Sequence, residues 1–512
     1  MKKSLLLLGI SLIALSCNTE ATKEDVVNYA SSITEAELKE HLYTYASDEF
    51  EGRDTGKPGQ KKAVEYLKKH YQDLNISPVI EGNYLQNVPL NIVKNPEVSI
   101  TINGTSFTYF DDYLSPAAAA TGNMSVSDVV YVGYGIDDKK YSSYTDIDVK
   151  GKVVVFKNGE PKDKAGNNVI TGSKEASKWS NGRQEMSAKR DAAKNKGAKA
   201  IFFMNDTMFK RYASFYKNRN SNNLSLPAKK DDAPAMYNFL ISEKMGKALV
   251  KNITKSTKTA TVSTKLEMDY KSVVVPQPSE NVVAMIKGSE KPDEYIVISS
   301  HLDHVGVNEK GEIFNGADDD GSGTVSLLEI AEAFKTAADN GHGPKRSVVF
   351  LHVTAEEKGL LGSKYYTDYE PLVPLANTVA NLNIDMVGRI DPKREGDRNY
   401  IYLIGADKLS TELHELSEAV NKEFMNIELD YTYNDENDPN RFYYRSDHYN
   451  FAKNNIPIIF YFNGTHDDYH KASDTPDKIN YDLLENRSRL VFHTAWELAN
   501  RENKIVVDKA TE

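Results

Sequence analysis

Histidine and acidic side chains gather at four points of the chain, and each point follows an apolar run. His301 and Asp303 follow the run 295–298, and the aspartate triplet 318–320 comes directly before Gly-Ser-Gly. Imidazoles and carboxylates at this density are typical of metal sites, whereas an aspartate run alone is as often a solvated loop. The glycines would let the backbone approach a metal closely. This segment therefore predicts a strand, a metal-binding loop and a helix that begins near Thr324.

The other three points supply further ligand types after predicted strands: Glu356 and Glu357 after 347–353, Asp385 after 379–384, and His466 to His470 after 456–462. Ligands of open α/β sheets bind at the carboxyl ends of the strands, so four loops would meet at one crevice. Divalent cations would relieve the repulsion among the carboxylates. Two imidazoles with three carboxylates suit zinc, with manganese or cobalt as alternatives.

Strands and helices alternate regularly in the second half of the chain. Apolar runs predict strands at 282–286, 295–299, 347–353, 379–384, 400–404 and 456–462. Helical patterns between them predict an α/β fold with a doubly wound, mixed and mainly parallel sheet. Nearer the N-terminus, the periodicity predicts helices at 32–45 and 59–73 and a hairpin at 98–109.

Length and composition limit the class of protein. A chain of 512 residues predicts two or three domains, and 40% hydrophobic residues are typical of a globular protein. The net charge of -11 argues against a nucleic-acid partner. Cys17 is the single cysteine, which excludes an intramolecular disulfide, a cysteine nucleophile and a cysteine-rich structural zinc site.

The first residues have the pattern of an export signal. Lys2 and Lys3 precede the apolar run 5–15, which is too short to span a bilayer and ends just before Cys17. This pattern resembles a bacterial lipoprotein signal, cut before Cys17 and lipidated there. The resemblance predicts a signal at 1–17, a tether at 18–30 and a protein anchored to a bacterial membrane that faces the periplasm or cell surface. An ordinary secretory signal is the alternative.

The middle of the chain changes character near residue 114. Predicted strands at 129–135, 151–156 and 197–203 make the segment 114–272 a mainly β insert. It resembles a protease-associated domain through 132–135, 148–153 and 197–200. The resulting division places the N-terminal part of the main domain at 31–113 and the catalytic domain at 273–505. The insert carries no catalytic pattern, which favours a lid or substrate-gating role.

The order of the ligand-type residues resembles the co-catalytic di-zinc aminopeptidase family, which includes secreted bacterial leucyl aminopeptidases and has the zinc exopeptidase fold. The shared pattern is His-x-Asp, Asp-x-Gly-Ser-Gly, Glu-Glu, an Asp after a strand and a late His; it covers roughly 280–480, with weaker similarity at 48–74. The resemblance implies two Zn²⁺ per chain and five ligands: His301 and Asp385 on one ion, Glu357 and His470 on the other, and Asp319 on both.

The same resemblance implies three further roles. Asp303 would accept a hydrogen bond from His301 and orient it. Glu356 would be the general base, and Tyr469 would stabilise the oxyanion. Two cations about 3.5–4 Å apart polarise a scissile carbonyl and lower the pKa of a bridging water. One of them can also bind a free N-terminal amine, which would restrict cleavage to chain ends.

Several assignments stay open on the residues alone. Asp318 and Asp320 are alternatives to Asp319, and His466 is an alternative to His470. We expect Ser322 to cap the following helix rather than to act as a nucleophile.

Three other features receive structural interpretations, and a fourth is left open. His304 is expected to support the ligands at most, and His352 is expected to be a core residue. The motif 445–448 is expected to shape the pocket wall, while the aromatic cluster 442–444 fits either core or a specificity pocket.

Zinc-dependent removal of N-terminal residues from peptides is the expected function, with no nucleic-acid partner. A carboxypeptidase or dipeptidase of the same fold is an alternative, in which Arg389 or Arg445 would hold the substrate carboxylate. A glutaminyl cyclase with one zinc and a non-catalytic receptor are further alternatives. The complete set of five ligands and a base argues against both.

Overall fold

The computed structural model describes residues 20–116, 119–182, 184–218, 223–229 and 235–509. The chain divides into two compact units. The larger unit consists of two segments, one up to Leu90 and one from Gln277 onward, and the smaller unit consists of residues 91–276. The smaller unit is therefore an insertion. The signal predicted at 1–17 lies outside the described residues. Within the described ranges, no helix is long and apolar enough to cross a membrane.

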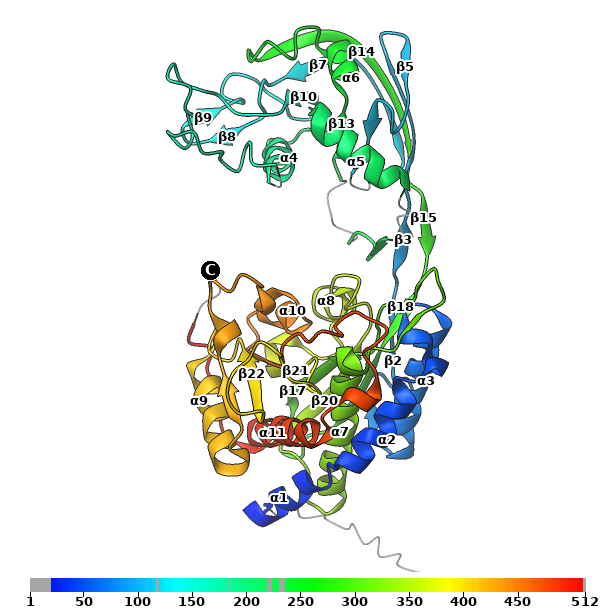
Figure 1. Cartoon of the computed structure of the whole chain (residues 1–512), viewed down its shortest axis with the longest axis vertical. Helices are drawn as coiled ribbons and strands as arrows, with labels where there is room; N and C mark the ends of the chain where they lie inside the picture. The colour runs from blue at the N-terminus through cyan, green and yellow to red at the C-terminus, as the bar shows by residue number, and fades with distance from the viewer. Residues whose placement is uncertain (1–19, 117–118, 183, 219–222, 230–234, 510–512) are drawn as a thin grey trace, which may run out of the picture. The chain divides into compact units, whose positions relative to one another are not determined.

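A nine-stranded mixed sheet forms the centre of the larger unit (Figure 1). Its strand order is β1-β16-β20-β17-β21-β24-β22-β23, and β2 also pairs with β16. The strands β20, β17, β21 and β24 run parallel, whereas β16 and β22 are antiparallel to their neighbours β20 and β24. The predicted doubly wound, mainly parallel sheet is confirmed.

The sheet strands of the larger unit are β1 (Ser77–Pro78), β2 (Leu85–Val88), β16 (Ser279–Ile286), β17 (Lys291–His301), β20 (Arg346–Val353), β21 (Thr378–Ile384), β22 (Tyr400–Ile404), β23 (Glu428–Asp430) and β24 (Ile458–Phe462). A separate short hairpin joins β18 (Gly306–Val307) and β19 (Ile313–Phe314). The helices are α1 (Lys23–Ser31), α2 (Glu35–Tyr45), α3 (Pro58–Asp73), α7 (Gly323–Asp339), α8 (Leu361–Asp368), α9 (Thr411–Val420), α10 (His448–Ala452) and α11 (Tyr481–Asn500).

Helices cover both faces of this sheet because successive strand residues are apolar on both sides. Ile296 and Ile298 of β17 belong to a core that also contains residues of α2, α3, α7 and α11. Val297, between them, packs in a second core with Tyr366 of α8 and Phe451 of α10. Figure 1 shows α8 and α10 on the side of the sheet opposite α7 and α11. Continuous apolar strands are expected for a parallel sheet buried on both faces.

Residues expected to form a tether instead begin the folded domain. Thr22 caps α1 in a capping box, in which Thr22 Oγ1 accepts from the Asp25 N–H and the Asp25 carboxylate accepts from the Thr22 N–H. Val26 and Tyr29 are buried in the core of the larger unit. The tether prediction for 18–30 is therefore corrected for 23–30, because apolar residues at helical spacing pack one face of α1.

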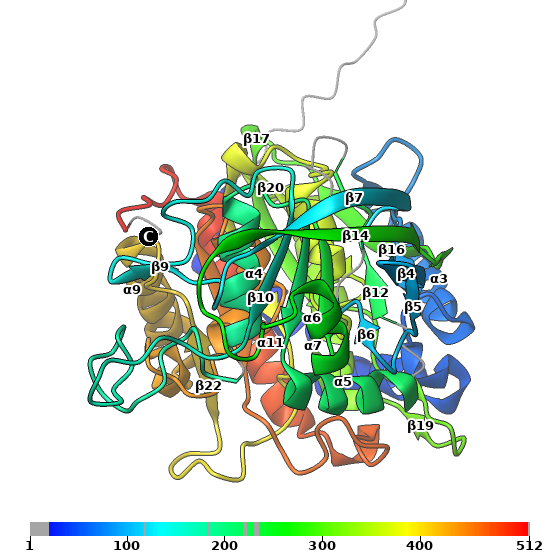
Figure 2. The same cartoon turned by 90° about the horizontal axis from the view of Figure 1, so that it is seen from above.

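The smaller unit has an eight-stranded sheet of order β5-β4-β14-β7-β10-β11-β13-β6 and a three-stranded sheet β12-β3-β15. Figure 2 shows its two long strands, β7 and β14, side by side. Its strands are β3 (Asn91–Val93), β4 (Glu97–Ile102), β5 (Thr105–Phe107), β6 (Tyr113–Leu114), β7 (Gly122–Tyr131), β8 (Asp137–Asp138), β9 (Tyr141–Ser142), β10 (Val153–Lys157), β11 (Ala200–Met204), β12 (Asn223–Ser225), β13 (Tyr237–Ile241), β14 (Ala260–Lys271) and β15 (Val274–Pro276). Its helices are α4 (Glu185–Asn195), α5 (Asp206–Asn218) and α6 (Glu243–Leu249). The likeness to a protease-associated domain stays a prediction.

The insert begins earlier than the sequence pattern suggests. The hairpin of β4 and β5 forms as predicted around Asn103 and Gly104, both with positive φ. However, β4 pairs along its whole length with β14, which makes it part of the smaller unit. The boundaries therefore lie at 90/91 and 276/277 rather than at 113/114 and 272/273, because a strand partner about 170 residues away leaves no local signal.

Candidate metal centre

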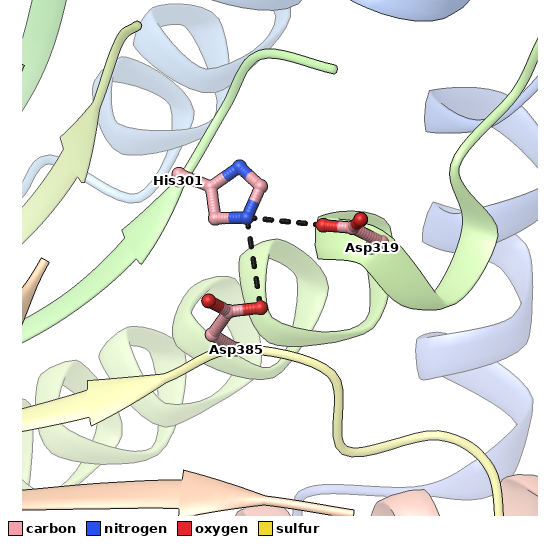
Figure 3. Close-up of side chains that lie close together, drawn as sticks. All are labelled: His301, Asp319 and Asp385. Atoms are coloured by element: carbon pink, nitrogen blue, oxygen red, sulfur yellow. Dashed lines mark ion pairs between the residues drawn. The ribbon is translucent and has the colours of Figure 1, made fainter. Parts of the chain in front are cut away.

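The imidazole of His301 faces two carboxylates from distant parts of the chain (Figure 3). His301 ends β17, Asp385 directly follows the adjacent strand β21, and Asp319 lies in a distorted helical turn, Ala317–Ser322, before α7. Nε2 of His301 lies 3.2 Å from Oδ1 of Asp319 and 3.6 Å from Oδ1 of Asp385. All three residues are buried. Neighbouring parallel strands thus bring their ligand-type residues together at their carboxyl ends.

A hydrogen bond determines which nitrogen of His301 faces these carboxylates. Nδ1 of His301 donates to the backbone carbonyl of Asp303 at 3.0 Å, because a carbonyl can only accept. In a neutral ring Nε2 then keeps its lone pair, and a lone pair among carboxylate oxygens is the donor set of a cation site. Burial alone would lower the pKa of His301, but the carboxylates of Asp385 and Asp319 raise it well above its ordinary value.

A second group of ligand-type side chains lies against the other oxygen of Asp319. Nε2 of His470 is 3.0 Å from Oδ2 of Asp319 and 3.2 Å from Oε2 of Glu357. Nδ1 of His304 is 2.8 Å from Oε1 of Glu357 and 3.8 Å from Oδ2 of Asp319. Zinc at about 2.0–2.2 Å from four tetrahedral ligands separates them by about 3.3–3.6 Å, and the distances in both groups scatter around that range. The residues therefore fit two zinc ions that share Asp319.

The carboxylates on either side of Asp319 in the sequence, those of Asp318 and Asp320, form contacts outside the two ligand groups. Both oxygens of Asp320 accept main-chain N–H groups, among them those of His301 and Met386. Oδ1 of Asp318 accepts from the Gly388 N–H at 2.7 Å, and its Oδ2 faces His466 rather than either ligand group. Asp319 is thus the member of the triplet that faces both groups, as the family resemblance implies.

A cavity adjoins both groups and holds the two other residues with expected roles in catalysis. Asp319, Glu356, Asp385, Tyr469 and His470 line it, together with the apolar side chains of Met386, Phe442, Phe460 and Phe462. Burial raises the pKa of Glu356 well above its ordinary value, and nearby carboxylates raise it further. The Tyr469 ring stacks on His470 with centroids 3.9 Å apart. Burial also raises the pKa of Tyr469, so its hydroxyl keeps its proton and can donate.

Asp303 lies where the sequence suggests but makes different bonds. Its backbone carbonyl, not its carboxylate, holds the His301 ring. The carboxylate accepts from the Glu356 N–H at 3.0 Å and from the Thr55 hydroxyl at 2.7 Å. The predicted contact is corrected: the Asp303 side chain fixes the main chain at Glu356, because the loop turns it toward that residue.

Two residues of the segment 48–74 support the site, and the chemical pattern alone did not single them out. Thr55 bonds to Asp303, as described. The buried guanidinium of Arg53 donates to the carbonyl oxygens of Asn315 and Gly316, directly before the Asp319 turn. The weak similarity at 48–74 was the available signal, since a buried arginine cannot be recognised from local sequence.

Residues near His466 form a separate group behind the turn. Nε2 of His466 lies 3.2 Å from Asp318 Oδ2, so His470 rather than His466 joins the ligand groups. Asp474 accepts from the N–H groups of Asp318 and Asp319 and thereby holds the turn. Arg389 forms ion pairs with Asp468 and Asp474 instead of facing the cavity.

Ser322 is not a side-chain helix cap. Its hydroxyl donates to Asp318 at 2.9 Å and accepts from the Val387 N–H at 3.0 Å, so it ties the turn to the segment after β21.

The motif 445–448 has the expected structural role, since Ser446 donates to Asp385 Oδ2 at 2.6 Å. In the aromatic cluster, Phe442 lines the cavity, whereas Tyr444 is 45% exposed.

Comparison with known proteins agrees with this geometry. Residues 281–495 match the model of peptidase family M28. That range contains every ligand-type residue of both groups.

Curated relatives match over shorter segments. The chain is 33% identical over 120 residues to LAMP1, a probable glutamate carboxypeptidase of Arabidopsis thaliana. The matched segment covers 23% of this chain and 16% of that protein. It is 36% identical over 109 residues to the mouse aminopeptidase NAALADL1 (21% and 14%) and 30% identical over 151 residues to the aminopeptidase YwaD of Bacillus subtilis (26% and 31%). The matched segments thus span less than a third of each relative's length.

Among solved structures, an aminopeptidase from Aneurinibacillus sp. strain AM-1 aligns over 95% of this chain and 98% of its own, with 20% identity and a TM-score of 0.48. The zinc aminopeptidase BSAP of Bacillus subtilis aligns over 94% and 98%, with 20% identity and a TM-score of 0.46.

Proposed function

We propose that this protein is a zinc-dependent exopeptidase that removes N-terminal residues from peptides. The observation that carries the proposal is the position of Asp319, whose two oxygens face two separate ligand groups in a cavity that Glu356 also lines. The match to peptidase family M28 supports peptide hydrolysis. We propose two Zn²⁺ per chain, held by His301 and Asp385 on one side and by Glu357 and His470 on the other, with Asp319 shared.

When bound, such a pair of cations polarises the substrate carbonyl, acidifies a water and offers a site for a free amine. The remaining chemistry belongs to the protein. Glu356 takes the proton of the attacking water and passes it to the leaving amine. The Asp303 carboxylate accepts a hydrogen bond from the main-chain N–H of Glu356 and so holds Glu356 in place. The Tyr469 hydroxyl donates to the oxygen that becomes negative during attack.

A carboxypeptidase is the second candidate, and Arg445 is the observation that favours it. Arg445 lines the cavity, with its guanidinium 4.9 Å from the Phe442 ring centroid. A guanidinium there can pair with a substrate carboxylate. Arg389, the other candidate from the sequence, is held by its aspartate partners.

Matched substrates separate the two functions. Leucyl-4-nitroanilide and free-N-terminal peptides should be cleaved, and the same peptides should resist when their N-termini are acetylated. Resistance of C-terminally amidated peptides, with cleavage of the acetylated ones, would instead establish a carboxypeptidase. Purified protein should contain about two zinc per chain, and removal by a chelator should abolish cleavage. A single tight zinc with cyclisation of N-terminal glutamine would overturn the proposal in favour of a glutaminyl cyclase.

We also propose export and lipid anchoring at Cys17, on the pattern of Lys2, Lys3 and the run 5–15. Expression of the full chain and of Cys17→Ser with labelled palmitate tests this. Label and membrane association should be present with Cys17 and absent from the variant. Equal membrane association of both would overturn the proposal.

A further inference from the structure

His304 is a buried histidine without the hydrogen bonds that such a residue ordinarily makes. It is 0% exposed, and neither ring nitrogen has a hydrogen-bond partner among the described residues. Nδ1 nevertheless lies 2.8 Å from Oε1 of Glu357, an oxygen that also lacks a hydrogen bond there. Burying polar atoms without partners destabilises a fold, because their bonds to water are lost and not replaced. Such a cluster therefore indicates a ligand that satisfies both side chains.

Another fully buried histidine shows the ordinary arrangement. His352, in β20, has Tyr71 Oη 2.7 Å from Nε2 and Ser300 Oγ 3.0 Å from Nδ1, so both nitrogens are satisfied by the protein. Among the described residues, no such neutral hydroxyl bonds to His304. Its neighbours are carboxylates and the ring of His470, whose centroid is 5.8 Å away.

The chain fixes the position of the His304 ring firmly. The His304 N–H donates to the carbonyl of Arg53 at 3.2 Å. The ring lies against Gly316, where an added Cβ would come within 2.5 Å of the His304 ring and 2.2 Å of the Asp319 carbonyl. Gly316 also has a φ of 53°. A side chain there would displace both the imidazole and the turn, so the glycine is required for this arrangement.

We propose that His304 is a further ligand of the zinc held by Asp319, Glu357 and His470. The inference rests on the proposed function and adds a residue that the family pattern does not include. His304, Asp319 and Glu357 each offer a ligand atom within 4.8 Å of the others. With His470, which lies 3.0 and 3.2 Å from the same two carboxylates, they complete a set of two imidazoles and two carboxylates. Four protein ligands are the usual number for tetrahedral zinc.

The two metal sites then differ in their number of protein ligands. The site of His301, Asp319 and Asp385 has three and keeps a position for water or substrate, as catalytic zinc sites do. The site that includes His304 has four and holds its ion more tightly. The ion at His301 should therefore leave first when a chelator is added.

The test uses the full chain as wild type, His304→Ala and His304→Gln, with His352→Gln as a control that also removes a buried imidazole. Zinc affinity is measured by competition with a chromophoric chelator, and far-UV circular dichroism checks the fold. Both His304 variants should lose affinity for the tighter zinc by more than about 100-fold, because loss of an outer-shell partner alone costs about 10–100-fold. His352→Gln should keep both zinc affinities.

X-ray absorption at the zinc edge provides a second readout that does not depend on any variant folding. Wild type should show about 1.5 imidazoles per zinc, from three histidines on two ions, and His304→Ala should show about one. A wild-type value of about one, or unchanged affinity in the His304 variants, would overturn the proposal. If the purified wild-type protein bound no zinc or cleaved no peptide, the proposed function would be overturned instead. Failure of the His304 proposal and failure of the proposed function are therefore distinguishable.

Discussion

The smaller unit and the candidate metal centre of the larger unit bury charged side chains in opposite ways. In the smaller unit, Lys189 is fully buried and donates to the carbonyls of Lys157 and Gly159 and to Oε1 of Glu185, at 2.8–3.1 Å. These three acceptors match the three N–H groups of the ammonium. Glu160 likewise accepts from Ser177 through both its N–H and its hydroxyl. The protein itself satisfies these charges.

At the candidate metal centre of the larger unit, like charges are gathered instead. Asp319, Glu356, Glu357 and Asp385 belong to one site. Within the described part of the chain, Oδ2 of Asp319 and Oε1 of Glu357 have no hydrogen bond. A buried charge whose hydrogen bonds are completed by the protein needs no ligand, whereas gathered carboxylates destabilise the fold until a ligand binds. The difference separates a structural use of charge from a functional one, and each prediction below tests it.

Glu356→Gln should have the largest effect. Turnover should fall by about 100- to 10,000-fold, because an amide cannot accept the proton of the attacking water. Zinc content, measured by atomic emission, should stay unchanged, since Glu356 is proposed as a base and not a ligand. Glu329→Gln, which alters a glutamate beside His41 instead, is the control and should keep its activity. Persisting turnover in Glu356→Gln would remove this role.

Lys189→Met should destabilise the smaller unit by about 3–5 kcal/mol, because it leaves a buried carboxylate without its partner. The two tryptophans lie one in each unit, Trp179 in the smaller and Trp496 in the larger. Urea unfolding followed by fluorescence in a Trp496→Phe background therefore reports on the smaller unit alone. The double variant with Glu185→Gln should recover part of the loss. If Lys189→Met also lost zinc, the structural charge of the smaller unit would not be separate from the functional charges of the metal centre.

Thr55→Val should reduce kcat and zinc affinity by about 10–100-fold, because Asp303 then loses the hydroxyl that holds it. Thr55→Ser keeps the hydroxyl and should restore both quantities. Steady-state kinetics and chelator competition provide the two readouts. If Thr55→Val and Thr55→Ser had the same kcat and zinc affinity, the hydrogen bond from Thr55 to Asp303 would not support the site.

His352→Gln should change the pH dependence of stability and leave the metal centre unaltered. Burial lowers the pKa of His352 to about 3, below its ordinary value of 6.5. Between pH 6.5 and 3 the unfolded chain binds a proton that the folded chain does not, so stability falls on acidification by about 1.4 kcal/mol per pH unit. Urea unfolding between pH 4 and 7 in a Trp179→Phe background should show a shallower slope for the variant. Equal slopes would show that His352 does not titrate this way.

Local patterns predicted much of the larger unit. The six strands from 282–286 to 456–462 all form, because continuous apolar runs bounded by polar loops favour buried strands. Since parallel strands share one carboxyl edge, the sequence also indicated that His301 and Asp385 would meet. The order of ligand types in the chain was enough to suggest zinc.

Only the tertiary structure decided which atoms meet. It selected Asp319 within its triplet, turned the Asp303 carboxylate toward Thr55 and Glu356, and placed His304 against Glu357. It also moved the insert boundary to 90/91 through the pairing of β4 with β14. Side-chain direction and strand partnership depend on groups far away in the chain, whereas strand and helix formation depend mainly on neighbours within a few residues.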